Sequence, residues 1–258
     1  MFVKTGDGID LYYESHGSID KPCVVFAHGA GGNAASWWQQ VPCFAEKYRV
    51  ITFDHRAFAR SLCAAEQFSV LQFEKDVLAI MDAEAINKAA LVCQSMGGWT
   101  GVRLSAFHPE RVSCLVLANT PGAIPSEELQ KQMRNLPTGP DSPPVSTLAI
   151  SEEFRTRDPM GACLYQAIND FTVTAPPIGN LMRPEVFLND TQLSAFCVPT
   201  LIVTSDLDTL FPRSLLEATA ARIGAKTAHV NDAGHSTYFE KPQQFNTLVG
   251  EFLQVHCQ

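Results

Sequence analysis

Short apolar runs alternate with helix-like segments along most of this sequence, and that alternation limits the fold more than any other feature. The runs at residues 23–27, 89–92 and 201–204 are apolar enough to be buried on both faces of a sheet. Segments with a helical pattern separate them, such as the one that ends at Pro109. This pattern favours an α/β fold, with a mostly parallel, twisted sheet and helices on both of its faces.

The individual elements follow from the same reading. A helix to about residue 83 is predicted to begin at a capping box formed by Ser69 and Gln72. Other helices are expected from Ser95 to Pro109, after Pro212 and after Pro242. The expected strands lie at residues 9–13, 23–27, 50–53, 89–92, 114–117, 201–204 and 227–230.

Residues 121–189 break the alternation. This segment contains ten prolines, interleaved with helix-like pieces at residues 126–134 and 160–168. A structureless loop of that length is uncommon in a compact domain. Apolar side chains such as Phe154 and Phe171 argue against the alternative of a disordered linker. We therefore expect a mainly helical lid at residues 121–189, inserted into a core domain formed by residues 1–120 and 190–258.

The overall composition excludes several kinds of partner. A net charge of −8 without a basic run excludes nucleic acid. The sequence contains no apolar stretch near the roughly 20 residues of a membrane helix and no signal core at its N-terminus, so we expect a cytoplasmic protein that does not bind membranes. The eight cysteines include no CxxC pair and are expected to be small, reduced core residues. A homodimer is compatible with the sequence.

Ser95 stands at a corner between the apolar run at residues 89–92 and a helix-like segment, in the sequence Val-Cys-Gln-Ser-Met-Gly-Gly. A serine placed there exposes its hydroxyl at the carboxyl edge of the sheet, where open α/β sheets bind ligands. The N-terminus of the helix also offers N–H donors to a developing oxyanion. The pattern matches the nucleophile elbow G-x-S-x-G, except that Cys93 occupies the first glycine position. A serine that only caps the helix is the alternative.

Other segments support the nucleophile. His28-Gly29-Ala30-Gly31-Gly32 follows one apolar run, carboxylates follow the run at residues 201–204, and Gly234-His235 follows the last run. With the chain order Ser, Asp, His, the sequence resembles the α/β-hydrolase family over nearly its whole length. The segment Asp-His-Arg-Ala-Phe-Ala-Arg-Ser at residues 54–61 is also similar to the family loop D-x-R-G-x-G-x-S, with alanine at two glycine positions.

The chemistry assigns a role to each of these residues. A serine hydroxyl needs a base, so His235 is expected to take the proton of Ser95 and deliver it to the leaving group. Asp208 is expected to orient His235. Asp206 follows the same run, but the segment Asp-Thr-Leu-Phe-Pro that begins at Asp208 resembles the pattern found in the family. The resemblance implies that the backbone amides of Ala30 and Met96 form the oxyanion hole.

Several further residues receive expectations. Trp38 and Trp99 are expected to line a substrate pocket, with core packing as the alternative. His28 resembles the structural histidine of the family turn, and Asp54 and Arg56 are expected to tie their loop together. The sequence contains no nucleotide-binding motif and no zinc-ligand spacing, so we expect no cofactor and no metal.

We therefore predict a serine hydrolase that cleaves a carboxylic ester or lactone of a small hydrophobic metabolite through an acyl-enzyme. Carbon–carbon bond hydrolysis of a vinylogous diketone is the second reading, because meta-cleavage-product hydrolases resemble this chain in triad and lid. A thioesterase, a lyase or a cofactor-free oxygenase on the same fold stay open. A ligand receptor is less expected, because a receptor does not need the triad. Ser95 argues against the haloalkane dehalogenases and epoxide hydrolases of this fold, which carry aspartate at the nucleophile position.

Overall fold

The described residues of the computed structural model, 1–135, 145–172 and 178–257, form one eight-stranded sheet. β1 pairs antiparallel with β2 and β2 antiparallel with β4, while the remaining pairs are parallel. The α/β fold class predicted from the alternation is therefore confirmed. In spatial order the strands are β1 (Phe2–Lys4), β2 (Asp10–His16), β4 (Arg49–Phe53), β3 (Cys23–Ala27), β5 (Ala89–Gln94), β6 (Val112–Ala118), β7 (Thr200–Ser205) and β8 (Lys226–Val230).

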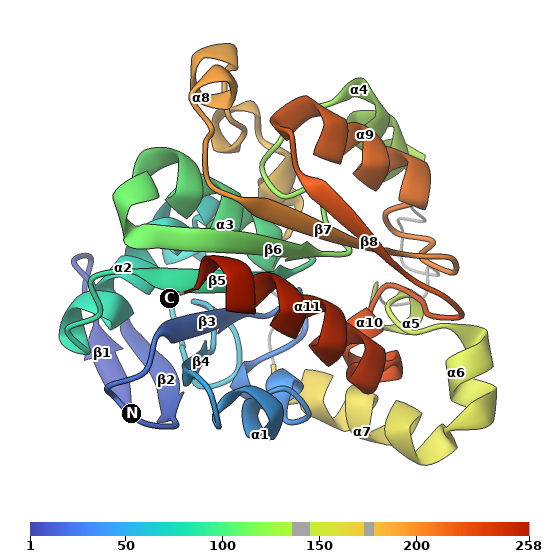
Figure 1. The fold of residues 1–258 in the computed structure, drawn as a ribbon, viewed down its shortest axis with the longest axis horizontal. Coiled ribbons are helices and arrows are strands. Elements are labelled where there is room, and N and C mark those ends of the chain that lie inside the picture. Colours follow the sequence, from blue (N-terminus) through green and yellow to red (C-terminus); the bar gives the residue numbers. More distant parts are fainter. Residues whose placement is uncertain (136–144, 173–177, 258) are drawn as a thin grey trace.

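Helices cover both faces of the sheet (Figure 1). One layer consists of α2 (Phe73–Ala83), α3 (Gly97–Phe107) and α9 (Arg213–Ile223). The other contains α1 (Val41–Phe44) and α11 (Pro242–His256), with α10 (Thr237–Glu240) leading into α11. Successive residues of a strand serve different layers: Val25 packs in the core under α2 and α3, whereas Val24 and Phe26 pack under α11. This double burial explains why the central strands read as continuous apolar runs.

Some expectations about the elements are wrong. Ser69 makes no side-chain cap; it precedes a 3-10 helix at Val70–Gln72, and α2 begins only at Phe73. The short edge strand β1 escaped prediction, because three half-exposed residues carry no pattern. The cysteines are free, as expected, but they are not all core residues. Four are buried (Cys23, Cys93, Cys114 and Cys257), one is partly buried (Cys63), and three are exposed (Cys43, Cys163 and Cys197).

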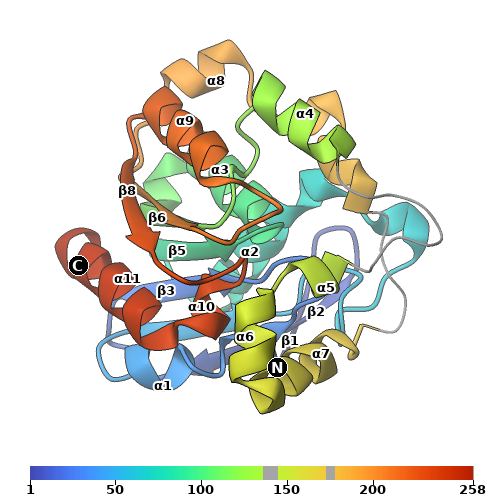
Figure 2. The same ribbon diagram turned by 90° about the vertical axis from the view of Figure 1, so that its right-hand side faces the viewer.

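The inserted segment divides into two groups of helices at the edge where the parallel strands end (Figure 2). α4 (Glu127–Asn135) lies beside α9 on one side, and on the other α5 (Val145–Leu148), α6 (Glu152–Arg157) and α7 (Pro159–Asn169) lie near α10. Two 3-10 helices, Ile178–Met182 and Pro184–Val186, lead to α8 (Asp190–Ser194). Parts of the predicted lid, residues 136–144 and 173–177, lie outside the described residues.

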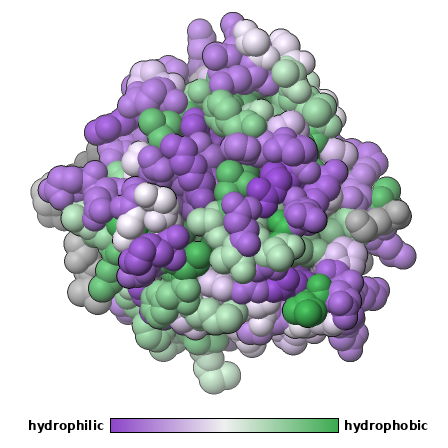
Figure 3. Space-filling view, turned by 90° about the vertical axis from the view of Figure 1, so that its left-hand side faces the viewer, coloured by the Kyte–Doolittle hydropathy of each residue, from purple (hydrophilic) through white to green (hydrophobic). Residues whose placement is uncertain are grey.

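On the face shown in Figure 3, hydrophilic and hydrophobic side chains are interspersed. In the described part of the chain, no helix combines the length and the apolar character that crossing a membrane requires.

Candidate active site

Ser95 lies at the sharp corner between β5 and α3, as the sequence predicts. Its φ of +49° falls in the left-handed region, which is unfavourable for serine and is maintained by the surrounding structure. The Ser95 amide donates to the carbonyl of Ala118 on the neighbouring strand at 3.2 Å. A Cβ at Gly97 would lie only 2.3 Å from the carbonyl oxygen of Ala27, so the corner requires glycine at this position.

Asp208 and His235 lie together in a buried pair. Nδ1 of His235 is 3.0 Å from Oδ2 and 3.2 Å from Oδ1 of Asp208. Oδ1 also accepts hydrogen bonds from the backbone amides of Leu210 and Phe211, both at 2.9 Å. Asp206, in contrast, is exposed and pairs with His229. The structure therefore places Asp208, not Asp206, against His235.

The other imidazole nitrogen of His235 is available. Nε2 is buried and has no hydrogen-bond partner among the described residues, and the ring packs against Phe211 with centroids 5.5 Å apart. The Gln94 side chain, next to Ser95, donates to the His235 carbonyl at 3.3 Å, which brings the histidine loop to the serine corner. Ser95 and His235 are not hydrogen bonded to each other here. Catalytic hydrogen bonds are often long before substrate binds.

One of the two predicted oxyanion amides directly follows Ser95, and the other belongs to the turn after β3. Ala30 follows β3, and Met96 directly precedes α3. Within the described chain, neither amide donates a hydrogen bond to another residue. A Cβ at Gly29 would lie 2.9 Å from the Ser95 Cβ, so the turn before Ala30 passes directly beside the serine. Two free N–H groups beside a serine are the donors that an oxyanion needs.

The elbow accommodates Cys93, where the usual pattern has glycine, because a glycine of α3 faces it. Its side chain is buried and faces α3, where a Cβ at Gly101 would lie 2.6 Å from the Cys93 Sγ. The space for the thiol is thus created by a glycine on the helix. Burial raises the pKa of the Cys93 thiol, which disfavours the thiolate and any role for this residue as a nucleophile.

Asn119 is a buried residue of the site that sequence reasoning missed. It follows β6, and its side-chain amide lies 3.1 Å from Oδ2 of Asp208. The available signal was a polar residue placed directly after a buried strand, at the same edge as the other site residues. That signal alone does not say which loop the amide will meet.

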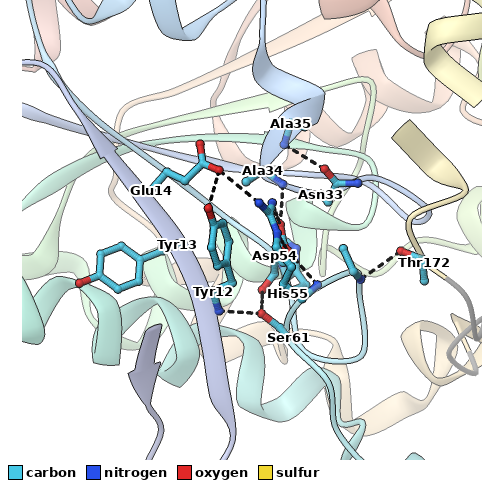
Figure 4. Close-up of polar contacts among 12 residues, drawn as sticks. Tyr12, Tyr13, Glu14, Asn33, Ala34, Ala35, Asp54, His55, Ser61 and Thr172 are labelled. Atoms are coloured by element: carbon cyan, nitrogen blue, oxygen red, sulfur yellow. Dashed lines mark hydrogen bonds and ion pairs between the residues drawn. The ribbon is translucent and has the colours of Figure 1, made fainter. Parts of the chain in front are cut away.

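Asp54, Arg56 and Ser61 hold the loop at residues 54–61, which we call the β4 loop. Asp54 accepts hydrogen bonds from the amides of Ala34 (2.7 Å) and Arg60 (3.0 Å), and Ser61 connects the Asp54 carbonyl to the Tyr12 amide of β2 (Figure 4). Arg56 is buried and bonds to Asp76 of α2 through two of its nitrogens, at 2.7 and 2.6 Å. These contacts are structural, as the sequence analysis expects.

Two buried histidines, His28 at the start of the turn that carries Ala30 and His55 of the β4 loop, pack edge to face with ring centroids 4.5 Å apart. Nε2 of His28 accepts the His55 amide at 2.9 Å, so the ring proton of His28 is on Nδ1, 2.7 Å from the Gly29 carbonyl. Burial lowers the pKa of His28 to about 4. Burial, together with the nearby His28, also lowers the pKa of His55 well below its usual value. Both rings are therefore neutral at pH 7 and serve as packing and hydrogen-bonding groups.

The two tryptophans predicted to line the pocket have different environments. Trp99 is buried on α3 and donates its indole N–H to the Leu181 carbonyl at 3.0 Å. Trp38 is half exposed and packs edge-on against Phe239. Contact with a substrate stays a prediction for both. Among the residues that the structure describes, no group of three or more His, Cys, Asp or Glu side chains could hold a metal ion.

Comparison with known proteins places the chain in a family. Residues 22–167 match the model of the alpha/beta hydrolase fold family, and the chain belongs to that family. It is 24% identical over 262 residues to 3-oxoadipate enol-lactonase 2 of Acinetobacter baylyi, covering 95% of this chain and 93% of the relative. It is 28% identical over 254 residues to the putative carbamate hydrolase RutD of Variovorax paradoxus, covering 94% and 96%.

Solved structures agree with this assignment. The structure described as "Est816 as an N-Acyl homoserine lactone degrading enzyme" superposes with a TM-score of 0.78 at 25% identity, covering 98% of this chain and all of that one. The enol-lactonase from Burkholderia xenovorans LB400 gives a TM-score of 0.80 at 24% identity, with the same coverage, and shows the shared fold. The family and the full-length relatives define the class of the protein as a hydrolase.

Proposed function

We propose that the protein is a serine hydrolase that cleaves a carboxylic ester or lactone of a small hydrophobic metabolite. The single observation that carries this proposal is the His235–Asp208 pair, whose buried Nε2 has no hydrogen-bond partner among the described residues and lies on the loop that meets the Ser95 corner. Similarity to an enol-lactonase and to an enzyme that degrades N-acyl homoserine lactones supports lactones as the substrate class.

The reaction follows from the chemistry of these groups. Ser95 Oγ attacks the carbonyl carbon while its proton passes to Nε2 of His235, and the amides of Ala30 and Met96 stabilise the oxyanion. The carbon–oxygen bond breaks, and the alkoxide receives the proton from His235. Water then attacks the acyl-enzyme with His235 as the base, which releases the acid and restores Ser95. Asp208 holds the His235 ring and stabilises its charged form throughout.

A carbamate is the second candidate substrate. The putative carbamate hydrolase of Variovorax paradoxus is 28% identical and matches nearly the full chain. Hydrolysis of a carbamate would begin with the same attack of Ser95 on a carbonyl carbon. That carbon carries one oxygen and one nitrogen substituent, and either of them could be the leaving group. Initial rates on matched carbamates and lactones of equal size separate the two candidates, since the preferred class should have the larger kcat/KM.

Labelling with a fluorophosphonate tests the proposed nucleophile without knowledge of the substrate. Ser95 Oγ would bond to phosphorus, fluoride would leave, and the proton would pass to His235. Wild-type protein and the exposed-serine control Ser194→Ala should be labelled stoichiometrically at Ser95, and Ser95→Ala should not be labelled. Labelling that persists in Ser95→Ala would refute the nucleophile assignment. Hydrolysis of a panel of lactones, esters, thioesters and dienones then ranks the chemistries.

Residues 121–189 are proposed to be the lid. The described helices of this segment contact the catalytic loops directly: Tyr165 of α7 bonds to Ser236 at 3.0 Å, and Gln132 of α4 donates to the carbonyls of Thr209 and Leu210. Exchange of the α6–α7 pair for that of a relative should change substrate preference more than it changes labelling of Ser95. We also propose a cytoplasmic location for the protein and a small hydrophobic molecule as its substrate.

A further inference from the structure

The side chain of Asn119 makes polar contacts among the hydrogen bonds of the carboxyl edge. Asn119 is fully buried, follows the last residue of β6 and has a φ of +51°, a conformation that asparagine tolerates better than most residues. Its amide is donated at 2.9 Å to the carbonyl of Val203 on β7. The backbone thus holds the side chain at the carboxyl edge, between β6 and β7.

Each polar atom of the Asn119 side chain is engaged with a loop of the candidate site. Nδ2 donates to Oδ2 of Asp208 at 3.1 Å and to Oγ of Ser205 at 2.8 Å. Oδ1 accepts the hydroxyl of Thr237 at 2.7 Å. Ser205 in turn donates to the carbonyl of Gly234 at 2.7 Å, next to His235. One carboxamide therefore connects the loop that carries Asp208 with the residues on both sides of His235. It bonds directly to Thr237 and reaches Gly234 through Ser205.

We propose that Asn119 is a positioning residue that fixes the Asp208 carboxylate, and through it the ring of His235. The proposal rests on the function proposed above. Oδ2 of Asp208 receives the Asn119 amide and the shorter contact from His235, at 3.0 Å, while Oδ1 receives the two backbone amides and the longer His235 contact, at 3.2 Å. The Leu210 and Phe211 amides fix the position of Oδ1. The hydrogen bond from Asn119 to Oδ2 then sets the rotation of the carboxylate plane about the Cβ–Cγ bond of Asp208.

The orientation matters because the imidazole has one useful direction. The hydrogen bond from Nδ1 to Asp208 selects the tautomer in which Nε2 is free to accept a proton. If the carboxylate rotates, Nε2 moves relative to Ser95, and a misplacement of about 1 Å costs roughly 100-fold in rate. Loss of Asn119 should therefore reduce the chemical step and leave substrate binding nearly unchanged.

Asn119→Asp is the sharpest variant. It preserves the size, the tolerance for positive φ and the acceptor for Thr237, but it replaces the donor that faces Asp208 with a carboxylate oxygen, whose charge repels that of Asp208. Asn119→Gly is the second variant, which accepts the backbone conformation and removes the side chain. Val116→Ala on the same strand is the matched control, because it removes buried volume from the core under α11 and Val116 takes no part in the hydrogen bonds that join Asn119, Asp208 and His235.

The rate of fluorophosphonate labelling, kcat and KM on p-nitrophenyl butyrate, Tm, and the low-field proton NMR signal of the His235 Nδ1–H are measured for each variant. We expect labelling and kcat to fall about 100-fold in both Asn119 variants, KM to change less than threefold, and the low-field signal to move or disappear. Val116→Ala should lower Tm and leave the labelling rate and the signal as in the wild type.

Three outcomes would overturn the proposal. The first is a folded Asn119→Asp that labels within threefold of the wild type. The second is an equal loss of rate in Val116→Ala, which would assign the effect to general stability. The third needs no variant: rapid solvent exchange of the Asn119 side-chain protons in the wild-type protein. Ser95→Ala separates this proposal from the function. If that variant is still labelled, the function fails; if it is not labelled while Asn119→Asp labels normally, only the role of Asn119 fails.

Discussion

Two clusters at the carboxyl edge of the sheet each combine a buried carboxylate with a buried histidine, yet they are built for different purposes. In the first, which we call the β7 cluster (Asn119, Asp208 and His235), the carboxylate holds the imidazole through Nδ1, and no residue that the structure describes bonds to Nε2. In the β4 loop, Asp54 instead holds backbone amides and the Arg60 side chain.

The histidine of the β4 loop shows the same contrast. His55 bonds to the Thr100 hydroxyl at 2.9 Å and packs against the tilted rings of Phe53 and Phe73. No carboxylate among the described residues is hydrogen bonded to His55. Its neutral state is set by burial. An imidazole that is to take a proton needs a carboxylate to stabilise the resulting charge, whereas one that supports a turn does not. The residue types in a cluster therefore say less than the atoms that face each other.

The largest expected effect is in the β7 cluster. Asp208→Asn should lower the rate about 10⁴-fold, because the amide stabilises the wrong tautomer of His235 and cannot stabilise its charged form. Asp206→Asn is the matched control and should cost less than tenfold, since Asp206 is exposed and pairs with His229. Steady-state kinetics on one ester measure both variants. The reverse ranking would transfer the role to Asp206.

The corresponding change in the β4 loop should affect stability instead of the chemical step. Asp54→Asn leaves the Ala34 amide and Arg60 with a weaker acceptor, so the free energy of unfolding should fall by about 2 kcal/mol. Turnover should change by less than tenfold. Urea unfolding and kinetics on the same preparations test this. A loss of rate on the scale of Asp208→Asn, with stability unchanged, would contradict the division between the two clusters.

His55 of the β4 loop and the neighbouring His28 predict how stability depends on pH. The folded pKa of His28, about 4, lies below the unfolded value near 6.5, so protonation favours the unfolded state. Stability is therefore complete above about pH 6.5 and is lost as pH falls toward 4. Burial also lowers the pKa of His55, so His55→Gln removes one group that contributes to this acid slope and should make it shallower by up to about 1.4 kcal/mol per pH unit, relative to wild type. The control is His256→Gln at the C-terminal helix, and an unchanged slope in His55→Gln would contradict the interpretation.

The smallest expected effect concerns the backbone of the β4 loop. Ala57 and Ala59 have φ values of +68° and +42°, at the positions where the family loop carries glycine. The left-handed conformation costs alanine about 1 kcal/mol or more, and glycine avoids this cost. Part of the resulting stabilisation is offset, because glycine makes the unfolded chain more flexible. Ala57→Gly should thus raise the free energy of unfolding by about 0.5 kcal/mol in a urea titration. In the β7 cluster, Asn119→Gly should bring no such gain, because it removes hydrogen bonds. Destabilisation by Ala57→Gly would show that the loop is not strained there.

Much of the architecture could be predicted from local patterns. The strand at residues 23–27 was predicted with its observed bounds, and the helix after Ser95 ends two residues before Pro109. These elements carry continuous apolar runs or clear stop signals. The edge strand β1, the missing cap at Ser69 and the exposure of Cys197 could not be predicted, because each depends on neighbours that are distant in the sequence.

The sequence by itself determined the order of strands and helices and the corner at Ser95, because burial periodicity and glycine requirements are local properties of the chain. Only the tertiary structure decided which carboxylate meets His235. Asp206 and Asp208 follow the same strand two residues apart, but the loop turns one toward solvent and His229 and the other toward the interior. Asn119 lies 89 residues from Asp208 in the chain, and the two meet because parallel strands bring their carboxyl ends to one edge of the sheet. The spacing of residues in the sequence does not predict this contact.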